Sequence, residues 1–197
     1  MENITVSLIQ ATPINPVGTT AVSKPYCTEG SETALFYKVA KVYKHESVME
    51  HIVFSFDIDG ISRLCLQELA RHRIASLTVQ STRFTLPKTI ELSQLEEYFV
   101  IPNNLSKLEQ MYYLNALAIQ VESYNNFSKI TSLPRNTLKY LLPESFRTSL
   151  VWTINARSLL NFLKLRLTPN AHYEIRHLAL LILELVKANY GDLFKEV

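Results

Sequence analysis

Glycine is scarce in this sequence, which has only four glycines among its 197 residues. They stand far apart, at Gly18, Gly30, Gly60 and Gly191. Neither a G-x-G-x-x-G fingerprint nor a P-loop can be built from them. Any nucleotide that this chain binds must therefore be held by side chains rather than by a glycine-rich loop.

Cysteine is also rare. Cys27 and Cys65 are far apart, which fits a reduced cytoplasmic protein with neither a disulfide framework nor a thiolate metal site. Two histidines, His172 and His177, are five residues apart, a spacing that does not place two ligands on one helical face. We therefore predict no metal site.

Long apolar runs are absent as well. The first residues, MENITVSLIQ, show no signal-peptide pattern, and the longest apolar run, LALLILELV, is interrupted by Glu184. That run is too short to span a bilayer. We expect a cytoplasmic protein that does not enter a membrane.

Positive charge is concentrated in one place. The formal net charge is +2 and 47% of the residues are hydrophobic, which suits one domain over residues 1–197 with a single core. A protein that coats nucleic acid would carry a larger basic surface. The cluster of Arg71, His72 and Arg73 therefore predicts a small anionic partner.

Hydrophobic periodicity predicts an α+β fold. Strands are expected over residues 5–11, 51–58, 76–84 and 149–155. Helices are expected over residues 32–43, 61–73, 105–127, 156–167 and 171–188. Gly60 is expected to break the chain between a strand and a helix, and residues 12–20 are expected to form a loop.

The basic cluster has two interpretations. Cations at the end of a helix complement its dipole, and Glu68 could pair with Arg71 and His72 at i+3 and i+4. Strand alternation in the following segment, however, would place Ser81 and Arg83 on one face, as a phosphate site requires. The sequence pattern leaves both interpretations open.

A second basic pattern occurs in NARSLLNFLKLRL. At about 100° per residue, Arg157, Asn161 and Lys164 share one polar arc of the predicted helix, whereas Arg166 falls on the apolar side beside Leu159. An arginine at this position is either a C-terminal cap that reaches solvent or a charge directed into a pocket. The end of the helix directly afterwards favours the cap.

The segment RHRIASLTVQSTR matches the R-H-R, seven residues, S-x-R signature of the flavin-dependent thymidylate synthases. Three further blocks occur in the same order as in that family: HESVMEHIVFSF, WTINARSLLNFLKLRL and AHYEIRHLA. The chain therefore resembles this family along its whole length. The resemblance implies an α/β arrangement of a twisted sheet with helices, assembled as a homotetramer with active sites shared between subunits.

The resemblance also implies a reaction. The family methylates dUMP to dTMP, takes the methylene group from methylenetetrahydrofolate, and uses NADPH to reduce FAD, which then supplies the hydride. Two rival classes are a thymidylate synthase that uses a cysteine nucleophile without flavin and an arginine-rich nucleic-acid-binding module without catalysis.

Site residues follow from the resemblance by position. The implied FAD contacts are His45, Ser47, Arg71, His72, Arg73, Val79, Asn155, Arg157 and Asn161. The implied dUMP contacts are Glu68, Arg71, Ser81, Arg83, Lys139 and Arg166. Arg166 matches the arginine that stabilises the anionic pyrimidine, so it is the expected catalytic residue. Val79, Phe84 and Lys139 depart from the residues that are usual in the family.

Overall fold

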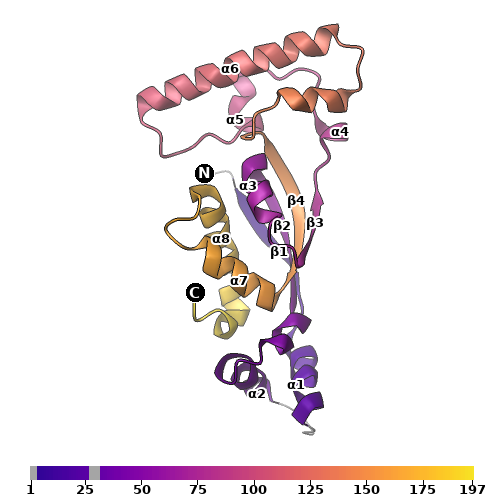
Figure 1. The fold of residues 1–197 in the computed structure, drawn as a ribbon, viewed down its shortest axis with the longest axis vertical. Helices are drawn as coiled ribbons and strands as arrows, with labels where there is room; N and C mark the ends of the chain where they lie inside the picture. The colour runs from indigo at the N-terminus through magenta and orange to yellow at the C-terminus, as the bar shows by residue number, and fades with distance from the viewer. Residues whose placement is uncertain (1–3, 27–31) are drawn as a thin grey trace. The chain divides into compact units, whose positions relative to one another are not determined.

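The chain folds as an α+β structure, as predicted. The computed structural model describes residues 4–26 and 32–197, so Cys27 lies outside the described residues. Four strands form one sheet in the order β1-β2-β4-β3 (Figure 1). They are β1 (Thr5–Ala11), β2 (Val53–Ser62), β3 (Ala75–Val79) and β4 (Arg147–Asn155).

The described residues also form α-helices. They are α1 (Thr19–Tyr26), α2 (Thr33–Tyr37), α3 (Arg63–Leu69), α4 (Thr82–Thr85), α5 (Leu95–Tyr98), α6 (Lys107–Ile130), α7 (Ala156–Arg166) and α8 (Tyr173–Tyr190). Shorter 3-10 or π segments cover Ile14–Gly18, Lys38–Val42, Glu46–His51, Leu92–Gln94, Arg135–Leu141 and Gly191–Leu193. Within residues 4–26 and 32–197, no helix combines the length and the apolarity that a membrane span requires.

Two compact units can be distinguished. The first consists of Ile4, Asp59–Gln67 and Val79–Leu150. The second consists of Glu68–Thr78, Val151–Val197 and the described residues of Thr5–Ile58. The prediction of one domain over residues 1–197 stays a prediction.

The second unit has an aromatic core on one face of β2. Strand alternation places Phe54 and Phe56 on the same side, and both are fully buried. Phe54 meets Tyr190 of α8 edge-on with 4.9 Å between the ring centroids, and Trp152 of β4 meets Phe162 of α7 at 5.0 Å. Helices α7 and α8 lie side by side, and α8 contacts β1 (Figure 1). This core fixes α7, which carries several predicted site residues.

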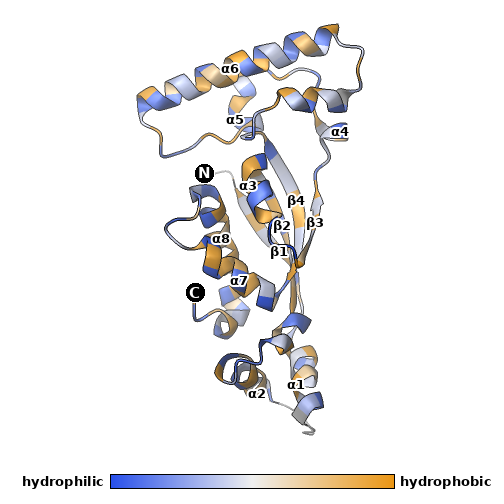
Figure 2. Ribbon diagram, in the orientation of Figure 1, coloured by the Kyte–Doolittle hydropathy of each residue, from blue (hydrophilic) through white to orange (hydrophobic). Residues whose placement is uncertain are grey.

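The first unit contains α6, whose N-terminus forms a capping box. Ser106 Oγ accepts a hydrogen bond from the Glu109 amide at 3.3 Å, and the Glu109 carboxylate accepts one from the Ser106 amide at 2.7 Å. Leu117, Val121 and Tyr124 are the buried residues of this helix. Figure 2 shows hydrophobic and hydrophilic residues interspersed along α6, which is typical of a helix that buries one side.

Gly60 does not break the chain, contrary to the prediction. Strand β2 continues to Ser62, and Gly60 lies within it at a φ of 81°, a conformation that favours glycine. Its carbonyl accepts a hydrogen bond from Arg147 Nη1 at 2.9 Å. Helix α3 therefore begins at Arg63 and ends at Leu69, so the basic cluster follows the helix rather than ending it.

The strand predicted over residues 76–84 is too long. Strand β3 ends at Val79. Backbone amides of α4 then donate hydrogen bonds to the Ser81 carbonyl, which turns the chain into that short helix. The prediction that Ser81 and Arg83 share one strand face is therefore wrong.

The other predicted elements are close to those observed. Strand β1 has the predicted bounds, and the helices expected over residues 105–127, 156–167 and 171–188 are α6, α7 and α8. The helix expected over residues 32–43 is α2 followed by the π segment Lys38–Val42. The expected loop over residues 12–20 instead contains a π segment and the start of α1.

Core packing around β2 gives a stability prediction. Phe54→Ala should lower the free energy of unfolding by about 3–5 kcal/mol, because it removes a fully buried ring and leaves a cavity that the neighbouring side chains fill only in part. Phe84→Ala is the matched control, since Phe84 is 77% exposed and should change stability by less than about 0.5 kcal/mol. Urea unfolding of both variants measures the difference, and equal losses would contradict the assigned core.

Candidate functional site

A cavity of about 870 Å³ lies in the second unit. Its volume falls within the range of small-molecule and cofactor sites. We call it the arginine-lined cavity. Its lining residues are Glu46, Glu50, Arg71, His72, Arg73, Ile74, Asn155, Arg157, Ser158, Leu160, Asn161, Lys164, Leu165 and Arg166.

Helix α7 forms one wall of this cavity. Its N-cap is Asn155, whose side-chain oxygen accepts a hydrogen bond from the Ser158 amide at 2.9 Å. One-turn spacing then places Arg157, Asn161 and Lys164 on the same side of the helix, and all three line the cavity. The predicted polar arc is therefore confirmed.

The R-H-R segment forms a second wall. The amides of Arg71 and His72 donate to the carbonyls of Glu68 and Leu69, so the chain makes a tight turn after α3. Arg71 and Arg73 are exposed, whereas His72 between them is half-buried. The His72 ring meets the Phe162 ring edge-on, with 4.9 Å between the centroids. The three neighbouring side chains thus have different surroundings.

Arg166 is held by the residues of this turn. Its Nη1 donates to Glu68 Oε2 at 2.8 Å, its Nη2 donates to the Glu68 carbonyl at 3.3 Å, and its Nε donates to His72 Nε2 at 3.1 Å. Only 20% of the Arg166 side chain is exposed. Arg166 therefore lines the cavity rather than reaching into solvent as a helix cap. Glu68 pairs with Arg166, not with Arg71 and His72 as one sequence interpretation proposed.

His72 is neutral in this setting. Burial and then the charge of Arg166 lower the pKa of His72 from its usual 6.5 to about 4. Because His72 Nε2 accepts the hydrogen bond from Arg166, the single proton of the neutral ring is on Nδ1. Protonation of His72 would place two cations 3.1 Å apart.

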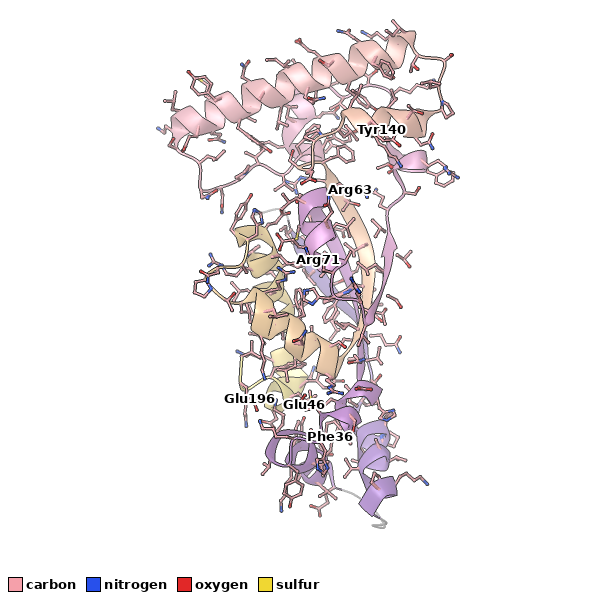
Figure 3. The ribbon with its side chains drawn as sticks, viewed as in Figure 1. Phe36, Glu46, Arg63, Arg71, Tyr140 and Glu196 are labelled. Carbon is pink, nitrogen blue, oxygen red and sulfur yellow. The ribbon has the colours of Figure 1, made fainter. Side chains whose placement is uncertain are left out.

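Two acidic residues that the sequence analysis did not single out also line the cavity. Glu50 Oε1 accepts a hydrogen bond from Arg157 Nη1 at 2.6 Å, and Glu46 Oε2 lies 3.6 Å from Arg157 Nε. Both belong to the 3-10 segment Glu46–His51, where their spacing of four in HESVMEH was the available signal. Arg71 and Glu46, labelled in Figure 3, reach the cavity from the turn after α3 and from this segment.

Lys164 also has an acidic partner. Glu196 Oε2 lies 3.1 Å from Lys164 Nζ, and Glu196 Oε1 accepts a hydrogen bond from Lys44 at 2.9 Å. The hydrogen bonds from Lys44 and Lys164 lower the pKa of Glu196 to about 2. Lys41 Nζ lies 3.5 Å from Glu196 Oε1 as well, so three lysines share this one carboxylate and the charge of Lys164 is offset only in part.

His45 and Ser47 are exposed on either side of Glu46 and do not line the cavity. Both residues belong to the same compact unit as the arginine-lined cavity. Their implied role as FAD contacts stays a prediction.

Four implied site residues belong to the first unit: Val79, Ser81, Arg83 and Lys139. A cavity of about 290 Å³ in that unit is lined by Arg63, Gln67, Thr82, Lys139, Leu142, Pro143, Glu144 and Phe146. Thr82 stands between Ser81 and Arg83 in the sequence, and Ser81 and Arg83 are both exposed. The implied substrate contacts are thus divided between the two units.

Comparison with known proteins identifies the family. The family model described as "Thymidylate synthase complementing protein" matches residues 8–190. The chain belongs to the flavin-dependent thymidylate synthase family. The family's member from Wolinella succinogenes is 41% identical over 165 residues, which cover 81% of this chain and 79% of that one. A member from Helicobacter pylori is 35% identical over 170 residues, covering 82% and 80% of the two chains.

Solved structures of flavin-dependent thymidylate synthases have the same fold. A crystal structure of thymidylate synthase X from H. pylori with FAD and dUMP has a TM-score of 0.84 to this chain. The two chains are 30% identical, and 98% of each is covered. The α+β fold of this chain is therefore that of the family.

The pKa of His72 gives a prediction about pH. Folding favours the neutral ring, so this residue contributes stability that is present above pH 6.5 and is lost as the pH falls from 6.5 towards 4. In protein labelled with ¹³C-histidine, the His72 resonance should stay in its neutral position at pH 6 and titrate near pH 4. A transition near pH 6.5 would show that Arg166 and burial do not act on this ring.

Proposed function

We propose that this protein converts dUMP to dTMP by reductive methylation, with methylenetetrahydrofolate as carbon donor, NADPH as reductant and FAD as cofactor. The observation that carries the proposal is Arg166, a largely buried arginine oriented within a cavity rich in arginine. Membership of the flavin-dependent thymidylate synthase family supports it. The comparisons give no support to a nucleic-acid-binding module.

The lining of the arginine-lined cavity fits FAD. Arg71 and Arg73 are exposed cations that suit a pyrophosphate, and Asn161 offers an amide for the polar edge of a ring system. Ile74 and Leu160 provide apolar surface for flat aromatic rings. No glycine loop is needed for such a site. When bound, FAD supplies hydride-transfer chemistry, which no side chain of the protein can perform.

Arg166 has the properties that activation of a pyrimidine requires. Its guanidinium is planar, permanently charged and partly desolvated, and such a group stabilises negative charge on a neighbouring ring. Stabilising the anionic form of uracil raises the electron density at C5, where the new carbon is added. We assign Arg166 as the catalytic residue.

The substrate phosphate requires cations as well. We propose that Ser81, Arg83 and Lys139 of the first unit bind dUMP, because a hydroxyl donor and two cations match a phosphate monoester. Ser81 and Arg83 are exposed, and Lys139 lines the cavity of the first unit. The resemblance implies an arginine at the position of Lys139. Because lysine binds phosphate only as a point charge, we expect this difference to affect dUMP affinity more than the chemical step.

We further propose that the enzyme is a cytoplasmic homotetramer with active sites shared between subunits. The buried free thiol of Cys65 suits a reducing compartment. The implied site residues are divided between two compact units, and this division is consistent with an active site that is completed by a second subunit.

The test begins with the purified protein. We expect a yellow protein with a flavin absorbance spectrum that sediments as a tetramer and forms dTMP from dUMP only when methylenetetrahydrofolate and NADPH are both present. Colourless protein that still forms dTMP would indicate the cysteine-dependent class. A monomer that retains FAD would contradict the shared site.

Arg166→Lys tests the catalytic assignment. A lysine keeps the charge but holds only one pyrimidine acceptor where the guanidinium can hold two, so the methylation rate should fall by roughly a hundredfold or more. Reduction of the flavin by NADPH should change much less, because uracil takes no part in that half-reaction. Stopped-flow absorbance of the flavin and chromatography of dTMP measure the two steps separately.

Lys187→Arg is a control for this variant, because Lys187 is an exposed residue of α8 and should tolerate the exchange in both assays. Near-normal methylation by Arg166→Lys, or a loss confined to flavin reduction, would show that Arg166 does not act on the pyrimidine.

A further inference from the structure

Three lysines converge on one carboxylate in the second unit. Lys44 Nζ donates a hydrogen bond to Glu196 Oε1 at 2.9 Å, and Lys41 Nζ lies 3.5 Å from the same oxygen. Lys164 Nζ donates to Glu196 Oε2 at 3.1 Å. Glu196 is labelled in Figure 3. In the described part of the chain, none of these lysines forms an ion pair with another acidic residue. We call Lys41, Lys44 and Lys164 the lysine cradle.

Fastening the segment after α8 does not require three lysines. Leu193 and Phe194 are fully buried, and Lys41 Nζ donates to the Leu193 carbonyl at 2.9 Å. These contacts already hold the segment. The side chains of Lys44 and Lys164 are 61% and 44% exposed, and exposed ion pairs contribute little to stability. Stability therefore does not explain why these two lysines are brought to one carboxylate.

The lysine cradle carries more positive charge than Glu196 offsets. Three lysines and one carboxylate leave two positive charges uncompensated around Glu196. Like charges that are held together repel one another, and binding of an anion removes this repulsion. A phosphate monoester carries about −1.5 to −2 charges at pH 7. The surplus charge of the cradle thus matches that of a phosphate monoester.

The carboxylate of Glu196 shows how the cradle holds an anion. Lys41 and Lys44 face its Oε1, whereas Lys164 faces its Oε2. A phosphate also presents several oxygens on one central atom, so the same ammonium groups can share it. The Glu196 side chain is 35% exposed and can rotate away while the buried Phe194 stays in place. A ligand phosphate can therefore take the place of this carboxylate.

The backbone at Lys44 is strained. Its φ is 58°, and among the described residues other than glycine it alone has a positive φ. This region is unfavourable for a residue with a β-carbon, and such strain is concentrated at ligand sites. The π segment Lys38–Val42 ends just before it, and the His45 amide donates to the Val39 carbonyl at 3.1 Å. The resulting turn brings Lys41 and Lys44 to the same carboxylate.

The lysine cradle is continuous with the arginine-lined cavity, because Lys164 belongs to both. A ligand whose phosphate lies on the cradle can therefore extend into the cavity. NADPH has this form, since its 2′-phosphate is a monoester and its nicotinamide must reach the flavin. FAD carries only a pyrophosphate, for which Arg71 and Arg73 are available.

We propose that the lysine cradle binds the 2′-phosphate of NADPH, and that Glu196 occupies the cradle until this phosphate takes its place. Cationic side chains recognise the same phosphate in other dinucleotide sites. The choice of NADPH as the ligand rests on the proposed function, whereas the anion site follows from the positions of the lysines.

Binding without turnover tests the lysine cradle. In flavin-loaded protein, NADP⁺ should bind roughly tenfold more tightly than NAD⁺, which lacks the 2′-phosphate. Lys44→Gln should lower the affinity for NADP⁺ about fivefold to tenfold, because it removes one charge-assisted contact that solvent partly screens. The affinity for NAD⁺ should not change. Isothermal titration calorimetry measures both affinities, and equal losses for NADP⁺ and NAD⁺ would overturn the proposal.

Lys195→Gln is the matched control. Lys195 is 74% exposed in the same segment, and it pairs with Asp192 rather than with Glu196. This variant should bind NADP⁺ as the parent protein does. If Lys195→Gln and Lys44→Gln lose the same affinity, the attraction is a general property of the surface and the cradle is not a site.

Glu196→Gln tests the anion that the chain itself supplies. The variant keeps the shape of the side chain but removes the negative charge that competes with phosphate. It should raise the affinity for NADP⁺ about twofold to tenfold, with no change for NAD⁺. A lower affinity for NADP⁺ would show that Glu196 serves only to hold the lysines in place and would contradict the exchange of anions.

Two further titrations separate the possible sources of the phosphate. Loss of dUMP affinity in Lys44→Gln, with unchanged NADP⁺ affinity, would assign the cradle to the substrate phosphate and overturn the choice of NADPH. Inorganic phosphate, followed by ³¹P NMR, should bind more weakly to Lys44→Gln than to Lys195→Gln. If the parent protein forms no dTMP yet this difference is found, the proposed function fails while the anion site is retained. Equal phosphate binding by the two variants would overturn the site itself.

Discussion

The contact of Arg166 with Glu68 and His72 is the interaction on which the site depends. An arginine whose side chain is 20% exposed would be costly without partners, and these two residues supply three acceptors for it. The contact joins the end of α7 to the turn after α3, and that turn also presents Arg71 and Arg73 to the cavity. One interaction thus links the proposed catalytic charge to the proposed cofactor cations.

The scarcity of glycine explains why such a site is built from side chains. A glycine-rich loop binds phosphates with backbone amides, which need no side-chain charge. This chain gathers cations from α7 and from the turn after α3, and it balances some of them with Glu46, Glu50 and Glu196. Cations that are already paired cost less to hold together in the absence of ligand.

Much of the fold follows from local patterns. The bounds of β1 and α7 are close to those predicted because apolar periodicity and a strong N-cap at Asn155 act over a few residues. The end of β2 depends on a distant partner, because the strand continues through Gly60, whose carbonyl accepts a hydrogen bond from Arg147. The end of β3 depends on the turn around Ser81 that follows it. Sequence periodicity contains no information about these contacts.

The same distinction applies to the site. The family signature indicated Arg71, His72 and Arg73, and helical periodicity indicated the polar arc of α7, and all of these residues line the cavity. It could not reveal that Arg166 contacts His72, since 94 residues separate them. Helical periodicity showed only that Arg166 lies on the apolar side of the predicted helix, where a charged side chain is unusual. The partner that explains this placement is visible only in three dimensions.

A crystal structure of this protein with FAD and dUMP would test the account most directly, through the contacts of a single side chain. The account predicts that Arg166 keeps its hydrogen bonds to Glu68 and His72 and directs its two remaining N–H groups at the oxygens or nitrogens of uracil. An Arg166 side chain that has left Glu68 and His72, or that faces solvent at the end of α7 with uracil bound elsewhere, would contradict it.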